Sequence, residues 1–120
     1  MRVLVKKPGE SIFSMYMPSE KNNFKEIIGC NCLDKIILKK ELYMYVDDSF
    51  ALKEDLAYNF TLKDNKDRLL HICGNVIVSR IKIVSDDFDY IDTTPGDLKS
   101  FNEILRKSKQ LEKKQGRQND

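Results

Sequence analysis

Residues 69–84, LLHICGNVIVSRIKIV, decide the fold class of this 120-residue chain. The stretch is rich in Ile and Val, whose branched side chains favour β-strands. It is longer than a usual strand, so Gly74-Asn75 predicts a bulge or a tight turn inside it. After that break the side chains alternate between two faces. One face carries Val76, Val78, Arg80 and Lys82, and the other, which we expect in the core, carries Ile77, Ser79, Ile81 and Ile83.

Two β-hairpins are predicted upstream of this stretch. Residues 1–6 and 11–17 each alternate, and Pro8-Gly9 between them is a typical turn pair. Residues 32–38 and 42–46 form a clearer hairpin around a polar break. Strands joined by such short connections pair antiparallel, so the sheet is expected to be antiparallel.

The first predicted helix covers residues 20–28. Phe24, Ile27 and Ile28 recur at helical spacing and form one apolar face. Ser19 precedes them as a candidate N-cap, and Gly29 follows where a left-handed residue often ends a helix.

The second predicted helix begins at Thr94-Pro95-Gly96-Asp97. Thr94 is a capping residue, Pro95 suits the first helical position, and Asp97 lies near the positive end of the helix dipole. We expect this helix to run from 95 to about 110 and to fray beyond Leu111. Its expected buried stripe consists of Leu98, Phe101, Ile104 and Leu105.

Together these elements predict a single α+β domain, an antiparallel sheet of five or six strands with two helices. The helices are expected on one face, which leaves the other face wet or free to bind. Residues 50–67 are expected to form a loop or one helical turn that packs Leu52, Leu56 and Phe60 onto the core. The compact domain is expected to span 1–105, followed by a basic helix end and flexible tail over 106–120.

The charge of the chain is unevenly distributed. Its net charge is +2, yet residues 106–120 hold six basic and two acidic residues. The stretch DDFDYID after the long strand is an acidic loop in this interpretation, either a contact for a basic surface or a solvated turn. The basic tail either contacts nucleic acid or a membrane surface, or serves solubility alone. The acidic loop contributes Asp86, Asp87, Asp89 and Asp92.

The three cysteines indicate a reducing compartment. No apolar run in the sequence suits an export signal or a membrane span, so we expect a cytoplasmic protein. Cys30-x-Cys32 and His71-x-Cys73 form a candidate zinc set. Their spacing differs from the usual turn-borne zinc motif, and burial as small apolar residues is the alternative. We expect no cofactor and no enzymatic activity, since no pair of residues has the spacing of an acid–base or nucleophilic site.

Several segments together resemble a family of small domains of unknown function. They are V-K-K-P-G-E, F-K-E-I-I-G, L-A-Y-N, I-C-G-N-V-I-V and D-L-K-S-F, within about residues 1–105. Phages and integrative elements of Gram-positive bacteria encode the members of this family. The sequence departs from the family pattern at Cys30, where Gly-Gly is usual, and at Ala57, where Pro is favoured. The resemblance implies an accessory protein without catalytic residues.

Three functions remain open at this stage. The first is a viral anti-defence protein that binds and inhibits a host protein, including a CRISPR effector, through the acidic loop. The second is a protein that sequesters a nucleotide signal. The third is a small nucleic-acid-binding regulator that uses the basic tail, and a homodimer is compatible with each. The candidate partner-binding residues are Asp86, Asp87, Asp89, Asp92, Tyr43, Tyr45, Arg80 and Lys82.

Overall fold

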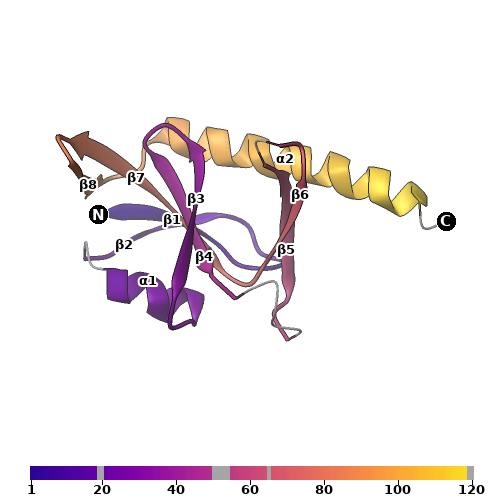
Figure 1. Cartoon of the computed structure of the whole chain (residues 1–120), viewed down its shortest axis with the longest axis horizontal. Helices are drawn as coiled ribbons and strands as arrows, with labels where there is room; N and C mark the ends of the chain where they lie inside the picture. Colours follow the sequence, from indigo (N-terminus) through magenta and orange to yellow (C-terminus); the bar gives the residue numbers. More distant parts are fainter. Residues whose placement is uncertain (19–20, 50–54, 65, 119–120) are drawn as a thin grey trace.

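Strand β7 (Val76–Val84) is the centre of the main sheet in the computed structural model, which describes residues 1–18, 21–49, 55–64 and 66–118 (Figure 1). The sheet has the order β2-β1-β7-β4-β3, and β8 (Asp87–Ile91) pairs with the far end of β7. All these pairs are antiparallel. The other members are β1 (Arg2–Lys6), β2 (Phe13–Tyr16), β3 (Leu33–Lys39) and β4 (Leu42–Asp47).

Six strands in this sheet and two helices confirm the predicted α+β class and both predicted hairpins. Helix α1 (Lys21–Ile28) begins beside the predicted N-cap, Ser19, which lies outside the described residues. At its other end Gly29 has φ +80°, the left-handed conformation expected there.

The two helices lie on opposite faces of the sheet, so the prediction that both cover one face is wrong (Figure 1). Phe24 of α1 packs with Val5 and Ile77, whereas Phe101 of α2 (Pro95–Gln118) packs with Val78 on the other face. Strand β7 is therefore buried on both sides from Val76 to Ser79, where its Val face is core as well as its Ile face. The prediction that Ile83 lies in the core is wrong, because neither β1 nor β4 flanks that end of β7. Alternation in the sequence marks two faces without saying what covers each of them.

A second, two-stranded sheet corrects the reading of residues 50–67. Residues 58–63 form strand β5 (Tyr58–Lys63), not a loop or helical turn, and pair with β6 (Leu69–Cys73). Phe60 is buried as expected, while Leu52 lies outside the described residues. Irregular apolar spacing hid this strand, because a bulge between Tyr58 and Phe60 shifts its register.

The break at Gly74-Asn75 is a change of sheet and not a bulge within one strand. Gly74 has φ +83°, which L side chains rarely adopt, and the chain passes there from β6 in the small sheet to β7 in the main sheet. Asn59 holds this corner because its side-chain amide donates to the Gly74 carbonyl at 2.8 Å.

Helix α2 is longer than predicted and continues through Gln118. Contacts with β5 hold the helix near and beyond its expected end. The buried hydroxyl of Ser108 accepts a hydrogen bond from the backbone N–H of Thr61 at 2.8 Å, and Tyr58 donates to Glu112 at 2.7 Å. The helix thereby covers the free edge of β5. The outer helical residue Leu98, expected in the buried stripe, is 36% exposed.

Candidate functional site

The acidic stretch is a strand, β8, and not the loop we expected. Its alternation places Phe88 and Tyr90 on one face and Asp87 and Asp89 on the other. A two-residue turn at Ser85-Asp86 joins β8 to β7, with Ser85 at φ +53°. Four Asp residues in the stretch suggested a turn, but the period-two pattern of the aromatic residues prevails.

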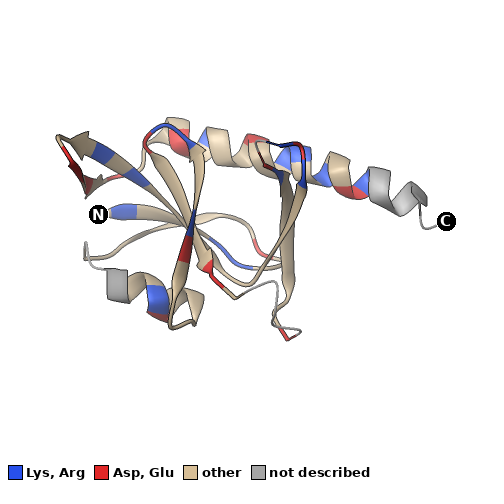
Figure 2. Cartoon of the chain, in the orientation of Figure 1, with Lys and Arg blue, Asp and Glu red and all other residues tan. Residues whose placement is uncertain are grey.

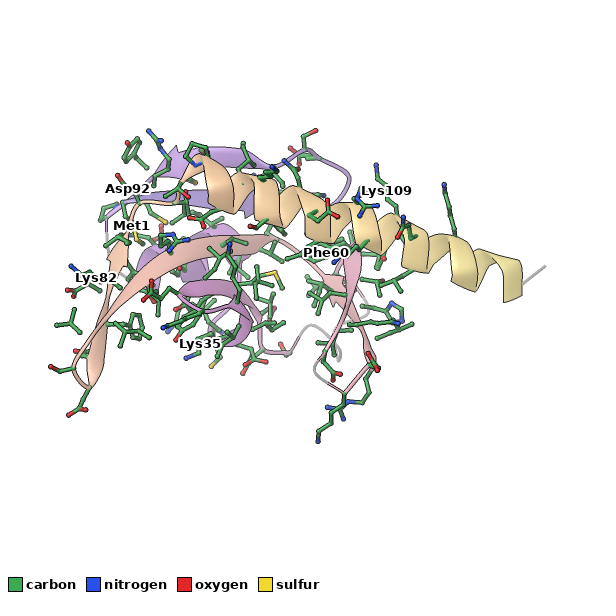
Figure 3. All side chains as sticks on the ribbon, turned by 90° about the horizontal axis from the view of Figure 1, so that it is seen from above. Met1, Lys35, Phe60, Lys82, Asp92 and Lys109 are labelled. Atoms are coloured by element: carbon green, nitrogen blue, oxygen red, sulfur yellow. The ribbon has the colours of Figure 1, made fainter. Side chains whose placement is uncertain are left out.

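The β7–β8 ribbon extends beyond the rest of the sheet. Strand β4 pairs with β7 no further than Arg80, and β1 no further than Val78. Residues beyond Ile81 therefore have only each other as strand partners, and the ribbon projects from one end of the molecule (Figures 1 and 3). Its base is fixed by Tyr90, whose ring packs edge-on against Phe24 with ring centroids 5.4 Å apart.

The ribbon carries free acidic groups and exposed apolar side chains. Asp86, Asp87 and Asp89 are exposed and form no ion pair within the described part of the chain (Figure 2). Ile83 and Val84 beside them are 51% and 48% exposed. Acidic and aliphatic groups together on a projecting element are suited to contact another macromolecule.

The fourth predicted carboxylate has a structural role. Asp92 accepts a hydrogen bond from the backbone N–H of Arg2 at 2.7 Å, and Arg2 in turn accepts one from the N–H of Thr93. These bonds join the end of β8 to the start of β1. Asp92 therefore holds the base of the ribbon and lies apart from its acidic tip (Figure 3).

The two predicted tyrosines do not form an open binding surface. Tyr45 is buried, and its hydroxyl lies 2.7 Å from that of Tyr90. Burial raises the pKa of Tyr45, and the Tyr90 hydroxyl raises it further. Tyr43 is partly exposed, with the Lys35 ammonium 4.6 Å from its ring centre and Phe88 against its edge. Both residues support the ribbon from the neighbouring strand.

Arg80 is occupied by a buried acidic partner. Its guanidinium donates two hydrogen bonds to Asp97, at 2.8 and 2.6 Å, and Asp97 is fully buried at the start of α2. Burial opposes ionisation of Asp97, but bonds from Arg80 and from the Thr94 backbone outweigh this effect, so the pKa of Asp97 is lowered. Lys82 remains exposed opposite Asp89, so among the predicted cations only Lys82 lies on an accessible surface.

A cleft that the sequence analysis did not identify lies between the β1–β2 loop, β5 and α2. Its volume is about 680 Å³, within the range of small-ligand sites. Lys6 and Glu10 line it from the first hairpin, Tyr58 and Asn59 from β5, and Lys109 from α2 beside the loop (Figure 3).

Two segments quoted for the family resemblance line this cleft. V-K-K-P-G-E supplies Lys6, and L-A-Y-N supplies Asn59. Asn59 donates to the carbonyls of Lys6 and Gly74, and its carbonyl oxygen accepts from the Lys6 ammonium at 3.0 Å. Gly74, which does not line the cleft, belongs to a third quoted segment, I-C-G-N-V-I-V. The sequence did not indicate that Lys6 and Asn59 share a cleft, because only the fold brings them together.

A hydrogen-bonded chain forms one wall of the cleft. The Tyr58 hydroxyl donates to Glu112 at 2.7 Å and also contacts the Thr61 hydroxyl, whose other neighbour is Nδ1 of His71 at 2.9 Å. Burial raises the pKa of Tyr58, and the Glu112 carboxylate adds to this effect. His71 thus participates in a structural network.

The candidate zinc residues do not form a metal site. Within the described residues, no group of three or more His, Cys, Asp or Glu side chains is placed to hold a metal ion. Cys30 and Cys73 are partly buried, whereas Cys32 is exposed, so burial as a small apolar residue does not apply to Cys32.

No protein-family model, curated protein or solved structure matches the chain. The resemblance to mobile-element domains therefore stays a prediction. In the part of the chain that the structure describes, no helix is long and apolar enough to span a membrane.

Proposed function

We propose that the chain is a non-enzymatic, cytoplasmic accessory protein that binds a host protein through the β7–β8 ribbon. The main support for this proposal is the projecting ribbon. On it, three carboxylates that form no ion pair within the described structure lie beside the exposed side chains of Ile83 and Val84. The resemblance described above makes a host defence component, including a CRISPR effector, the expected target.

The two kinds of group on the ribbon support different parts of binding. The carboxylates attract a basic surface and accelerate encounter, an effect that salt weakens. The exposed aliphatic groups supply contact area that leaves water on binding. The rigid base around Tyr90 limits the ordering cost, because the ribbon already holds its conformation before it meets a partner.

Affinity capture with the tagged chain tests this proposal, using three forms of the protein. They are the wild type, a ribbon variant and a control variant. The ribbon variant combines Asp86→Asn, Asp87→Asn and Asp89→Asn, which remove charge and keep shape. The control combines Glu26→Gln and Asp67→Asn, which remove exposed charges elsewhere.

A host protein retained by the wild type and the control, and lost from the ribbon variant, supports the proposal. At about 0.5 kcal/mol for each exposed charge, the ribbon variant is expected to bind roughly tenfold more weakly. Equal retention by all three forms discards the ribbon as the binding surface. A partner lost equally from the ribbon and control variants indicates unspecific attraction to net charge and also contradicts the proposal.

A further inference from the structure

We propose that the cleft between the β1–β2 loop, β5 and α2 binds a nucleotide-like organic phosphate, with the phosphate on Lys6 and Lys109 and a ligand hydroxyl on Glu112. The site shares no residue with the β7–β8 ribbon, so the two proposals stand or fall separately.

Lys6 is the first reason to expect an anion. Its ammonium is partly buried and donates to two neutral oxygens, the Lys7 carbonyl at 2.8 Å and the Asn59 amide at 3.0 Å. One of its three N–H groups is left for a ligand. Burial lowers the pKa of Lys6, and nearby Glu10 offsets part of this effect. An anion in the cleft would compensate the partly desolvated charge.

Lys109 on α2 provides the second cation. Neither Lys6 nor Lys109 forms an ion pair within 4 Å among the described residues, whereas Arg106 in the same lining is paired with Glu103. Two available ammonium groups from separate elements of one cleft can both reach a phosphate, whose several oxygens accept from more than one donor.

Glu112 and Tyr58 suggest what the rest of the ligand carries. The Oε1 atom of Glu112 accepts from Tyr58 and from Ser108 at 3.3 Å. Within the described residues no donor bonds its other oxygen, which can accept a ligand hydroxyl. The Tyr58 ring is 44% exposed and lines the cleft, so it can contact an aromatic base. A ligand that carries a phosphate, a hydroxyl and an aromatic ring has the chemical groups of a nucleotide.

The cleft is held in shape without a ligand. Asn59 joins the ends of β1, β5 and the corner before β7 through the carbonyls of Lys6 and Gly74. Ser108 ties the opposite wall to β5 through the Thr61 N–H. A preformed site loses little conformational entropy when a small ligand enters.

Thermal unfolding and calorimetry at low salt test the proposal with AMP, inorganic phosphate and adenosine as probes. AMP at about ten times a Kd near 1 mM is expected to raise Tm by about 5–6 °C. Adenosine, which lacks the phosphate, is expected to have little effect. Glu112→Gln is expected to weaken AMP and leave inorganic phosphate unchanged.

Lys6→Met is expected to reduce AMP affinity at least tenfold. Because Lys6 also bonds the protein, Lys109→Met serves as a second variant at an exposed position, with an expected loss of several-fold. Lys107→Met, at an exposed position of the same helix outside the cleft lining, is the matched control and should bind AMP like the wild type. Absence of any Tm shift or heat with AMP overturns the proposal. So does an equal loss in the Lys107→Met and Lys109→Met variants.

Discussion

Removal of the Asp97 carboxylate should destabilise the fold more than removal of any exposed acid. Asp97 is fully buried and accepts two hydrogen bonds from Arg80 and one from the Thr94 backbone N–H at 2.9 Å. The Thr94 hydroxyl in turn accepts from the Asp97 N–H at 3.2 Å. One side chain therefore caps α2 and joins it to the central strand β7.

The magnitude follows from what Asp97→Ala leaves behind. Loss of one partner of a buried pair costs about 3–5 kcal/mol. Arg80 is 22% exposed and keeps Glu41 at 3.8 Å, so the lower end of that range applies. The variant also loses the side-chain bond to the Thr94 N–H but keeps the bond from the backbone N–H of residue 97 to the Thr94 hydroxyl, which adds up to about 1 kcal/mol. We expect the free energy of unfolding to fall by about 3–4 kcal/mol.

Urea unfolding followed by circular dichroism measures this change through the midpoint at constant slope. Glu103→Ala is the matched control because Glu103 forms an exposed pair with Arg106 on the same helix. That variant should lose no more than about 0.5 kcal/mol. An Asp97→Ala loss below about 1 kcal/mol, similar to the control, would refute the reasoning. A double variant with Arg80→Met should lose less than the sum of the single changes.

The same carboxylate predicts an acid dependence with a definite sign. The folded-state pKa of Asp97 is lowered, so the unfolded chain binds the proton more readily. The stabilisation is present above the ordinary Asp pKa of about 3.9 and is lost as pH falls through the folded-state value. Asp97→Asn should remove this part of the acid limb, and an unchanged limb would contradict the assignment.

Three further changes test the packing. Phe101→Ala should lower the free energy of unfolding by about 3–4 kcal/mol, whereas Leu98→Ala on the exposed side of the same helix should change it by less than about 0.5 kcal/mol. Tyr90→Phe should lower the free energy of unfolding by about 1 kcal/mol, because it leaves the buried Tyr45 hydroxyl without that partner. Replacing both tyrosines by Phe should cost less than Tyr90→Phe alone, and the midpoints of urea unfolding compare the two variants. Gly74→Ala should lower Tm, because an L side chain at this positive φ strains the backbone by about 1 kcal/mol. The added methyl makes only ordinary contacts, so an unchanged Tm would contradict the assigned strain at this corner.

Local signals predicted most of the elements. Alternation and turn residues located both hairpins, and the Thr94-Pro95-Gly96-Asp97 start located α2. The signals failed where composition and pattern disagreed. The Asp-rich β8 has the composition of a loop, and a bulge interrupts the apolar alternation of β5. Both strands pair with an adjacent strand in a hairpin, so cross-strand pairing prevails over local composition and over the irregular spacing of apolar residues.

The candidate sites depended on tertiary structure to a greater degree. The acidic residues were identified from sequence, yet only the pairing limits of β4 and β1 show that they project on a ribbon. In the sequence, Arg80 and Tyr45 are candidates for binding a partner. In the fold, the Arg80 guanidinium is bonded to Asp97 and the Tyr45 hydroxyl to that of Tyr90. Whether an Arg or a Tyr side chain is available to bind a partner depends on the side chains that pack against it in the fold.

The sequence by itself determined the class of the fold, the antiparallel hairpins and the beginning of each helix. These features depend on contacts within a few residues, which periodicity and capping report directly. Only the tertiary structure decided that the helices cover opposite faces, that residues 69–84 divide between two sheets, and that Lys6 and Lys109 line one cleft. Such arrangements depend on which apolar faces bury each other, and a periodic pattern marks a face without specifying its partner.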